Sequence, residues 1–195
     1  MKVLAIVGSL RENSCAALAP RAGGDLSPEG VELEIFEGLD SIPAYSADHD
    51  PAYDGPEAVA AEVENLRDSI TAADALLIVT PEYNAGPPGY LKNAIDWASR
   101  PHKASSLAGK PAAIVSQSPM PFGGIWANQS IRKSLTITGT PTVERELAIG
   151  KVDEKIEDGR LVEDQARTDL TALMAELNEL VAVIAGQQAE PAAMA

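Results

Sequence analysis

Residues 75–80 read ALLIVT and are followed at once by Pro81-Glu82-Tyr83-Asn84. Such a short apolar run, rich in β-branched residues, predicts a strand covered on both faces, as in the middle of a parallel sheet. A proline cannot donate a hydrogen bond to a continuing ladder, so the strand is expected to end at this point. The stretch therefore predicts an α/β fold with a polar loop directly behind a buried strand.

Four further segments have strand character, and helical patterns separate them. The strands are predicted at residues 2–8 (KVLAIVG), 31–36 (VELEIF), 111–116 (PAAIVS) and 142–149 (TVERELAI). The helices are predicted at about 14–23, 57–72, 91–97, 125–138 and 166–184. This alternation predicts a three-layer sandwich, in which a five-stranded parallel sheet of order 2-1-3-4-5 has helices on both faces.

The chain shows no internal repeat and no sign of a second core. Residues 1–186 are expected to form a single domain, and residues 187–195 a disordered tail. Residues 37–56 contain five prolines or glycines and no sustained period, so they are predicted to be a surface excursion. Asp48-His49-Asp50 within it is interpreted as solvated, because one imidazole between two acids is a poor metal-ligand set.

Composition narrows the class of protein. Fifteen Lys and Arg against 29 Asp and Glu give a net charge of −14, which argues against a nucleic-acid partner. With one cysteine, Cys15, and two histidines, neither an internal disulfide nor a buried zinc site is expected. The apolar run at residues 3–7 is too short for a signal sequence or a membrane span. We expect a cytoplasmic protein without a metal and without membrane attachment.

Three polar loops follow the first, third and fourth predicted strands. They are residues 8–14 (GSLRENS), 81–86 (PEYNAG) and 116–124 (SQSPMPFGG). Parallel strands end at one edge of the sheet, so the loops are expected to meet in the crevice where the strand order reverses. In the first loop, Ser9, Arg11 and Ser14 offer donors beside a predicted helix start, which suits a phosphate. Alternatively, the serines only cap a turn and a helix, and Arg11 is solvated.

The second and third loops also have two interpretations. The rigid Pro81-Glu82-Tyr83-Asn84 exit can place a flat heterocycle beside it, with backbone N–H groups of residues 82–84 as donors. Alternatively, it is a turn in which Tyr83 packs on a helix and Asn84 closes a local hydrogen bond. Gly123 and Gly124 permit either a close approach to a ligand or positive φ in a long turn.

The first two loops (Gly8-Ser9-Leu10-Arg11 with Ser14, and Pro81-Glu82-Tyr83-Asn84), together with residues 88–97 (PGYLKNAIDW), resemble the NADPH-dependent FMN reductase family of the flavodoxin-like superfamily, which includes quinone, azo-dye and chromate reductases. The resemblance covers about residues 2–185. It implies a flavodoxin-like fold, non-covalent FMN, and NADPH or NADH as co-substrate. It also implies hydride transfer from NAD(P)H to flavin N5 and onward to a quinone, flavin or similar small-molecule acceptor, without a catalytic side chain, because FMN carries the chemistry. A homodimer or homotetramer is implied as well.

The resemblance implies the following cofactor-binding residues: Ser9, Arg11 and Ser14 on the phosphate; Pro81, Glu82, Tyr83 and Asn84 against the ring; and Ser116, Gln117 and Ser118 bordering the ring or ribityl chain. Three positions depart from the family pattern. Ala16 stands where Asn is usual, Gly86 where many relatives have Ser, and Ile125-Trp126 where many have Arg. The last departure bears on the subunit contact and on nicotinamide recognition more than on FMN.

Two other functions stay open at this point. A flavodoxin-type electron carrier would bind FMN but would not react with NAD(P)H, and an acidic surface is compatible with steering a redox partner. Reduction of the bound flavin by stoichiometric NADPH separates the enzyme from the carrier. A flavin-free regulator on the same scaffold would stay colourless when FMN is added.

Overall fold

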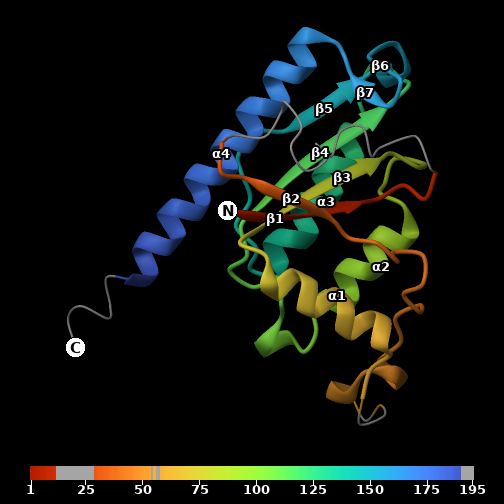
Figure 1. The fold of residues 1–195 in the computed structure, drawn as a ribbon. Coiled ribbons are helices and arrows are strands. Elements are labelled where there is room, and N and C mark those ends of the chain that lie inside the picture. Colours follow the sequence, from red (N-terminus) through yellow and green to blue (C-terminus); the bar gives the residue numbers. More distant parts are fainter. Residues whose placement is uncertain (12–28, 54, 56–57, 190–195) are drawn as a thin grey trace.

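A five-stranded sheet in the order β2-β1-β3-β4-β5 forms the middle layer of the computed structural model, which describes residues 1–11, 29–53, 55 and 58–189 (Figure 1). The strands are β1 (Lys2–Val7), β2 (Glu32–Ile35), β3 (Ala75–Pro81), β4 (Ala112–Ser118) and β5 (Leu147–Gly150). All four neighbouring pairs are parallel. The predicted flavodoxin-like topology is therefore confirmed.

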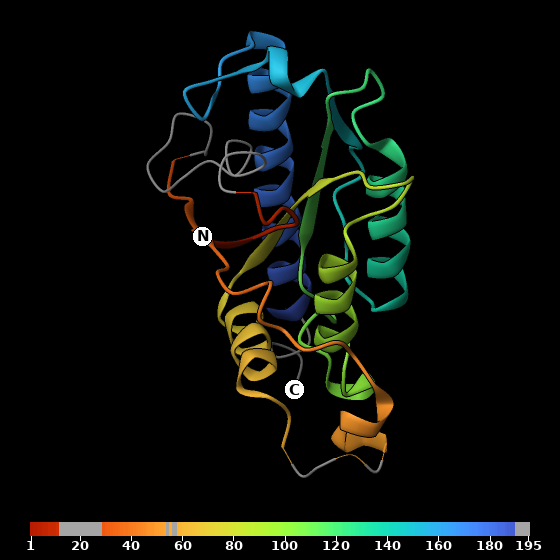
Figure 2. The ribbon, with the colours of Figure 1, turned by 90° about the vertical axis from the view of Figure 1, so that its right-hand side faces the viewer.

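Helices cover both faces of this sheet. They are α1 (Ala61–Ala72), α2 (Gly89–Ala98), α3 (Ile125–Ile137) and α4 (Asp164–Ala189). α4 lies on the face opposite α1, α2 and α3 (Figure 2). Successive residues of β1 alternate between the two cores: Val3 packs on the α4 side and Leu4 on the other. This two-sided burial explains why the central strands are apolar without a period of two.

Element ends differ from the predictions where a local contact decides them. α1 begins at Ala61 because Ala60 is extended, although the apolar pattern starts earlier. β5 is limited to Leu147–Gly150, since Thr142 makes only an isolated bridge to Ala112. The helix predicted from Ser14 falls outside the described residues.

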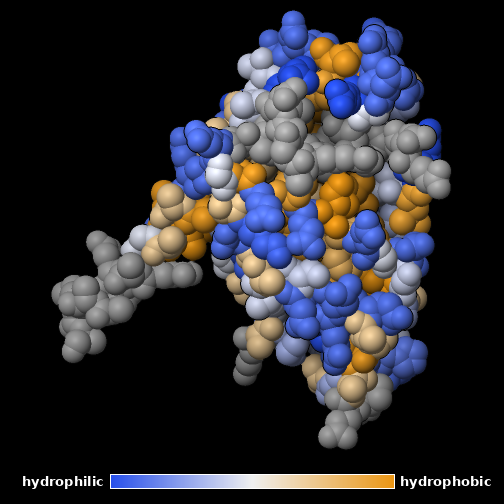
Figure 3. Space-filling model, viewed as in Figure 1, coloured by the Kyte–Doolittle hydropathy of each residue, from blue (hydrophilic) through white to orange (hydrophobic). Residues whose placement is uncertain are grey.

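α4 is longer than predicted. It continues to Ala189, so the first three residues of the predicted disordered tail are helical. Its second half extends past the sheet in Figure 1, and Figure 3 shows hydrophobic side chains along this part. Among the described residues, no helix is both long and apolar enough to cross a membrane.

Residues 37–53 are more than a surface excursion. They contain two 3-10 helices, Ala47–His49 and Pro51–Tyr53, and bury Leu39 and Ile42 in the core. Asp50 is only 2% exposed and accepts hydrogen bonds from the Tyr45 hydroxyl at 3.1 Å and the Ala52 N–H at 3.0 Å. The interpretation of Asp50 as solvated was therefore wrong, because its charge is satisfied by donors from its own segment.

A small hairpin after β5 was not predicted. β6 (Ile156–Glu157) and β7 (Arg160–Leu161) pair antiparallel, and Asp158 and Gly159 between them both have positive φ, 47° and 71°. An Asp-Gly pair is a strong sequence signal for such a two-residue turn. Buried Leu161 anchors the hairpin on the α4 side of the core.

Candidate active site

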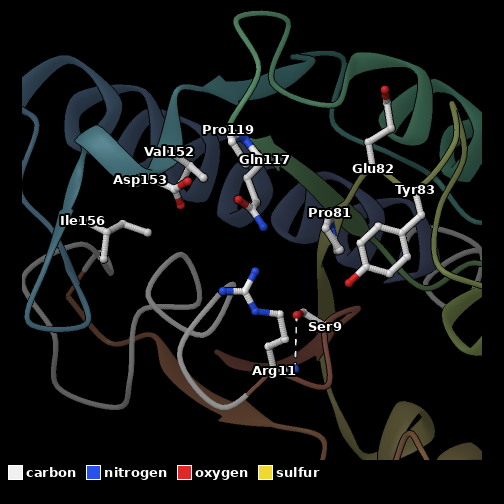
Figure 4. Close-up of a pocket in the computed structure, with 10 residues that line it drawn as sticks. All are labelled: Ser9, Arg11, Pro81, Glu82, Tyr83, Gln117, Pro119, Val152, Asp153 and Ile156. Carbon is white, nitrogen blue, oxygen red and sulfur yellow. Dashed lines mark hydrogen bonds between the residues drawn. The ribbon is translucent and has the colours of Figure 1, made fainter.

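A cavity of about 290 Å³ opens where the parallel strands end. It is lined by Ser9, Arg11, Pro81, Glu82, Tyr83, Gln117, Pro119, Val152, Asp153 and Ile156 (Figure 4). These residues lie at the ends of β1, β3 and β4 or just after them, and in the segment that follows β5; the parallel topology brings the strand ends to one edge. The crevice predicted from the strand order is therefore present.

The loop after β1 brings a cation to this cavity. The Gly8 N–H donates to the Val79 carbonyl at 2.7 Å, and a Cβ on Gly8 would lie 2.6 Å from the Leu91 side chain, so a glycine lets β1 end tightly against α2. The Ser9 hydroxyl accepts from the Arg11 N–H at 3.4 Å, and the Arg11 guanidinium points into the cavity (Figure 4). Ser14 lies outside the described residues.

The loop after β3 is a tight reverse turn. Tyr83 and Gly86 exchange two backbone hydrogen bonds, of 2.8 and 3.1 Å, while Asn84 and Ala85 between them have φ of 51° and 63°. The turn leaves Tyr83 45% exposed at the cavity, whereas Asn84 is not part of the lining. The Tyr83 N–H donates within the turn, so the turn already uses one of the three backbone donors predicted for a ligand.

The Glu82 side chain is directed elsewhere. Its carboxylate accepts from the N–H groups of Trp126 at 3.0 Å and Ala127 at 3.2 Å, and in Figure 4 it points away from the cavity. Gly124, at the N-cap of α3, makes no side-chain capping hydrogen bond, so Glu82, directly after β3, supplies the acceptor. Glu82 therefore lines the cavity while its charge serves the helix terminus.

Alternation along β4 separates the three predicted residues of the third loop. Gln117 lines the cavity, but Ser116 is buried on the other face, where its hydroxyl accepts from Asn128 Nδ2 at 3.5 Å. The Ser118 hydroxyl accepts from the Met120 N–H at 3.1 Å and is not part of the lining. The structure thus brings Gln117 to the site and leaves Ser116 and Ser118 outside it.

The two glycines of the third loop pack closely against other parts of the protein. Gly123 and Gly124 have positive φ, 63° and 74°. A Cβ on Gly123 would lie 2.5 Å from the Ala148 carbonyl carbon of β5. Both glycines therefore serve the long turn and its packing on a neighbouring strand.

The segment after β5 supplies a wall that was not predicted. Val152, Asp153 and Ile156 line the cavity, and Val152 is buried. Residues 151–157 (KVDEKIE) contain no serine, threonine or glycine, the residue types that marked the other loops. The Asp158-Gly159 turn was the available signal for the hairpin that carries Ile156 to the site.

The motif at residues 88–97 has a structural role. Asn93 accepts from the Tyr45 N–H at 2.8 Å and donates to the Pro43 carbonyl at 2.9 Å, and Trp97 Nε1 donates to the same carbonyl at 2.8 Å. Lys92 pairs with Asp96 at 2.6 Å. Ile95 and Trp97 are buried in the core, as expected. The motif therefore fastens residues 43–45 to α2 at a distance from the cavity lining.

The donors and surfaces of the cavity fit FMN. Arg11 and Ser9 offer a guanidinium and a hydroxyl for a phosphate, and Gln117 offers an amide for polar groups. Pro81 and Tyr83 provide flat apolar surface for a ring system. Within the described ranges, no group of three His, Cys, Asp or Glu side chains is placed to hold a metal ion.

Comparison with known proteins assigns the family. The sequence model described as NADPH-dependent FMN reductase matches residues 1–154. The chain belongs to this family. The reductase is 39% identical over 173 residues to a quinone reductase of Pseudomonas putida, covering 88% of this chain and 90% of the relative. It is 41% identical over 169 residues to an NAD(P)H-dependent FMN reductase of Pseudomonas aeruginosa, covering 86% and 88%.

A solved structure agrees with this assignment. The reductase superposes with a TM-score of 0.74 on FerB, a flavoenzyme NAD(P)H:acceptor oxidoreductase from Paracoccus denitrificans, at 30% identity over 95% of this chain and 97% of the other. The predicted family and enzyme class are therefore confirmed, as is the requirement for FMN and NAD(P)H. The reductase is an FMN-dependent oxidoreductase.

Proposed function

We propose that this reductase transfers reducing equivalents from NAD(P)H through FMN to a quinone or a similar small-molecule acceptor. The cavity that places Arg11 and Tyr83 on walls from different strands is the observation that carries the proposal, because FMN needs both a phosphate site and a ring site. The reductase names of the relatives favour an enzyme over a flavodoxin-type carrier. When bound, FMN supplies hydride acceptance and onward electron transfer.

The residues of the chain would position and enclose this chemistry. Arg11 and Ser9, with Ser14 by resemblance, would hold the phosphate, and Pro81 and Tyr83 would flank the ring. Gln117 would donate or accept at the edge of the ring or along the ribityl chain. Glu82 would not exchange a proton with the substrate, because its carboxylate is hydrogen-bonded to the start of α3.

The surroundings of the site support a planar, apolar acceptor. Tyr83 is half-exposed at the cavity, and Met120 and Phe122, in the loop that follows lining residue Pro119, are 66% and 77% exposed. Exposed apolar residues grouped near a cavity mark interaction surfaces. A quinone ring can stack on such side chains without requiring a charged partner.

The exposed side chains of α3 support a homodimer or homotetramer, and we place the protein in the cytoplasm only as the sequence led us to expect. Trp126 at the start of α3 is 60% exposed and Ile137 at its end 83% exposed. Trp126 also lines an open depression with Ala85, Gln129, Ser130 and Lys133, next to the turn after β3. A second copy covering this face would lie beside the cavity. Light scattering of the wild type and of Trp126→Lys measures the molar mass in solution and so tests the proposed oligomer. A wild-type monomer would contradict it.

FMN binding and turnover test the function. Arg11→Ala should weaken FMN binding about tenfold or more, because a charge-assisted hydrogen bond contributes about 1.5–3 kcal/mol. Riboflavin, which lacks the phosphate, should bind both proteins equally. Fluorescence titration of the apo-protein gives both affinities. Failure of NADPH and NADH to bleach the FMN-loaded wild type, or of a quinone to restore its colour, would contradict the enzyme.

A further inference from the structure

Asp153 faces Arg11 across the cavity. Figure 4 shows the Asp153 carboxylate and the Arg11 guanidinium on opposite walls, both directed inward. Both residues line the same cavity of about 290 Å³, and partly enclosed charges are screened by salt less than fully exposed ones. A charge on one wall is therefore felt by a ligand held on the other.

Backbone contacts hold Asp153 in its position. The Lys151 N–H donates to the Met120 carbonyl at 3.2 Å, and the Lys155 N–H donates to the Val152 carbonyl at 3.0 Å. Val152, next to Asp153, is buried in the core on the α4 side. The carboxylate thus stands on a wall attached to both the loop after β4 and the core.

Nearby cations are directed to other carboxylates. Lys151 Nζ lies 3.9 Å from Glu154, and Lys155 Nζ lies 3.6 Å from Glu163. The other carboxylate of the described lining, Glu82, points away from the cavity and is held by α3. Within the described lining, the inward-facing charges are therefore Arg11 and Asp153.

We propose that Asp153 is a selectivity residue that lowers the affinity of the cavity for phosphate-bearing flavin, so that FMN is held as an exchangeable ligand. The inference rests on the proposed function, in which Arg11 binds the phosphate. The carboxylate repels the phosphate and offsets part of the attraction from Arg11, while an uncharged flavin is unaffected. Asp153 thereby speeds the exchange of FMN without contacting the ring.

The test compares two Asp→Asn variants of the full-length apo-protein. Asp153→Asn removes the facing charge, and Asp158→Asn makes the same chemical change in the hairpin turn, where Asp158 is not part of the cavity lining. Affinities and dissociation rates for FMN and riboflavin are measured at 0.1 M and 1 M NaCl. Urea unfolding of each apo-protein establishes that the variants are folded.

We expect a gain in affinity for FMN but not for riboflavin. Asp153→Asn should bind FMN about fivefold more tightly at 0.1 M NaCl and release it more slowly, with riboflavin unchanged. The gain should shrink at 1 M NaCl, where the Debye length is about 3 Å, and Asp158→Asn should behave as the wild type. An unchanged ratio of FMN to riboflavin affinity in Asp153→Asn would overturn the inference.

The Arg11→Ala variant separates this inference from the proposed function. If Arg11→Ala loses FMN selectively while Asp153→Asn has no effect, only the role of Asp153 is wrong. If Arg11→Ala leaves the ratio of FMN to riboflavin affinity unchanged, the phosphate is not on Arg11. The inference then fails together with the proposed binding mode.

Discussion

The carboxylate of Glu82 accepts a hydrogen bond from the backbone N–H of Trp126 at 3.0 Å and so joins the end of β3 to the start of α3. A second bond, from the Ala127 N–H, strengthens this link. The residue in the cavity wall is thus also the cap of the helix beside it. These hydrogen bonds predict that substitutions of Glu82 lower the stability of the fold.

Glu82→Ala should lower the free energy of unfolding of the apo-protein by about 1–2 kcal/mol, the usual cost of losing a helix cap. Glu82→Gln keeps an acceptor oxygen, so its free energy of unfolding should fall by less. Urea unfolding at pH 7 measures both. Glu144→Ala, at an exposed position, serves as the control and should change stability by less than about 0.5 kcal/mol. A fully stable Glu82→Ala variant would contradict the capping role.

Ala85→Gly should stabilise the protein. Ala85 has φ of 63° in the turn after β3, a conformation that costs a residue with a Cβ about 1–2 kcal/mol and glycine little. After the entropy of the added glycine is subtracted, a gain of about 0.5–1 kcal/mol is expected in urea unfolding. Ala108→Gly, in an exposed turn without positive φ, should instead destabilise. Equal losses in both variants would refute this explanation.

Asn93→Ala should destabilise the protein without changing FMN affinity. Its side chain makes hydrogen bonds to the Tyr45 N–H and the Pro43 carbonyl, and losing them should cost about 2–3 kcal/mol. Lys92→Ala on the same helix removes only a surface ion pair and should cost less than about 1 kcal/mol. Thermal unfolding and FMN titration measure the two properties. A selective loss of FMN binding would place Asn93 in the site instead.

Glu163 should make stability depend on acid pH. The Ala166 N–H donates to its carboxylate at 2.7 Å and lowers the pKa of Glu163 below its ordinary value of 4.5. A carboxyl whose pKa is lower in the folded than in the unfolded protein stabilises the fold at every pH above its unfolded pKa. This stabilisation is lost as the pH falls through the folded pKa. The wild type should therefore be more stable than Glu163→Gln at pH 7. The free energies of unfolding of the two proteins should converge below pH 4.5. A gap that widens on acidification would contradict the sign.

Several residues predicted for the site line one cavity, but the sequence did not predict the whole lining. Ser9, Arg11, Pro81, Tyr83 and Gln117 were predicted, and all line the cavity, because loops after parallel strands must share one edge. Asp153 was missed because its place depends on where the segment after β5 packs. Nothing in its neighbouring residues marks it as facing Arg11.

Apolar strands and helical periods in the sequence by themselves determined the sheet order, the two-sided core and the edge that carries the site, since each follows from local patterns of period and burial. Only the tertiary structure decided where individual side chains at that edge point. Glu82 is directed to α3 and Ser116 to Asn128, partners 44 and 12 residues away. Such contacts form only after packing, because a polar side chain at a strand end turns toward whichever donor or acceptor the folded chain brings within reach.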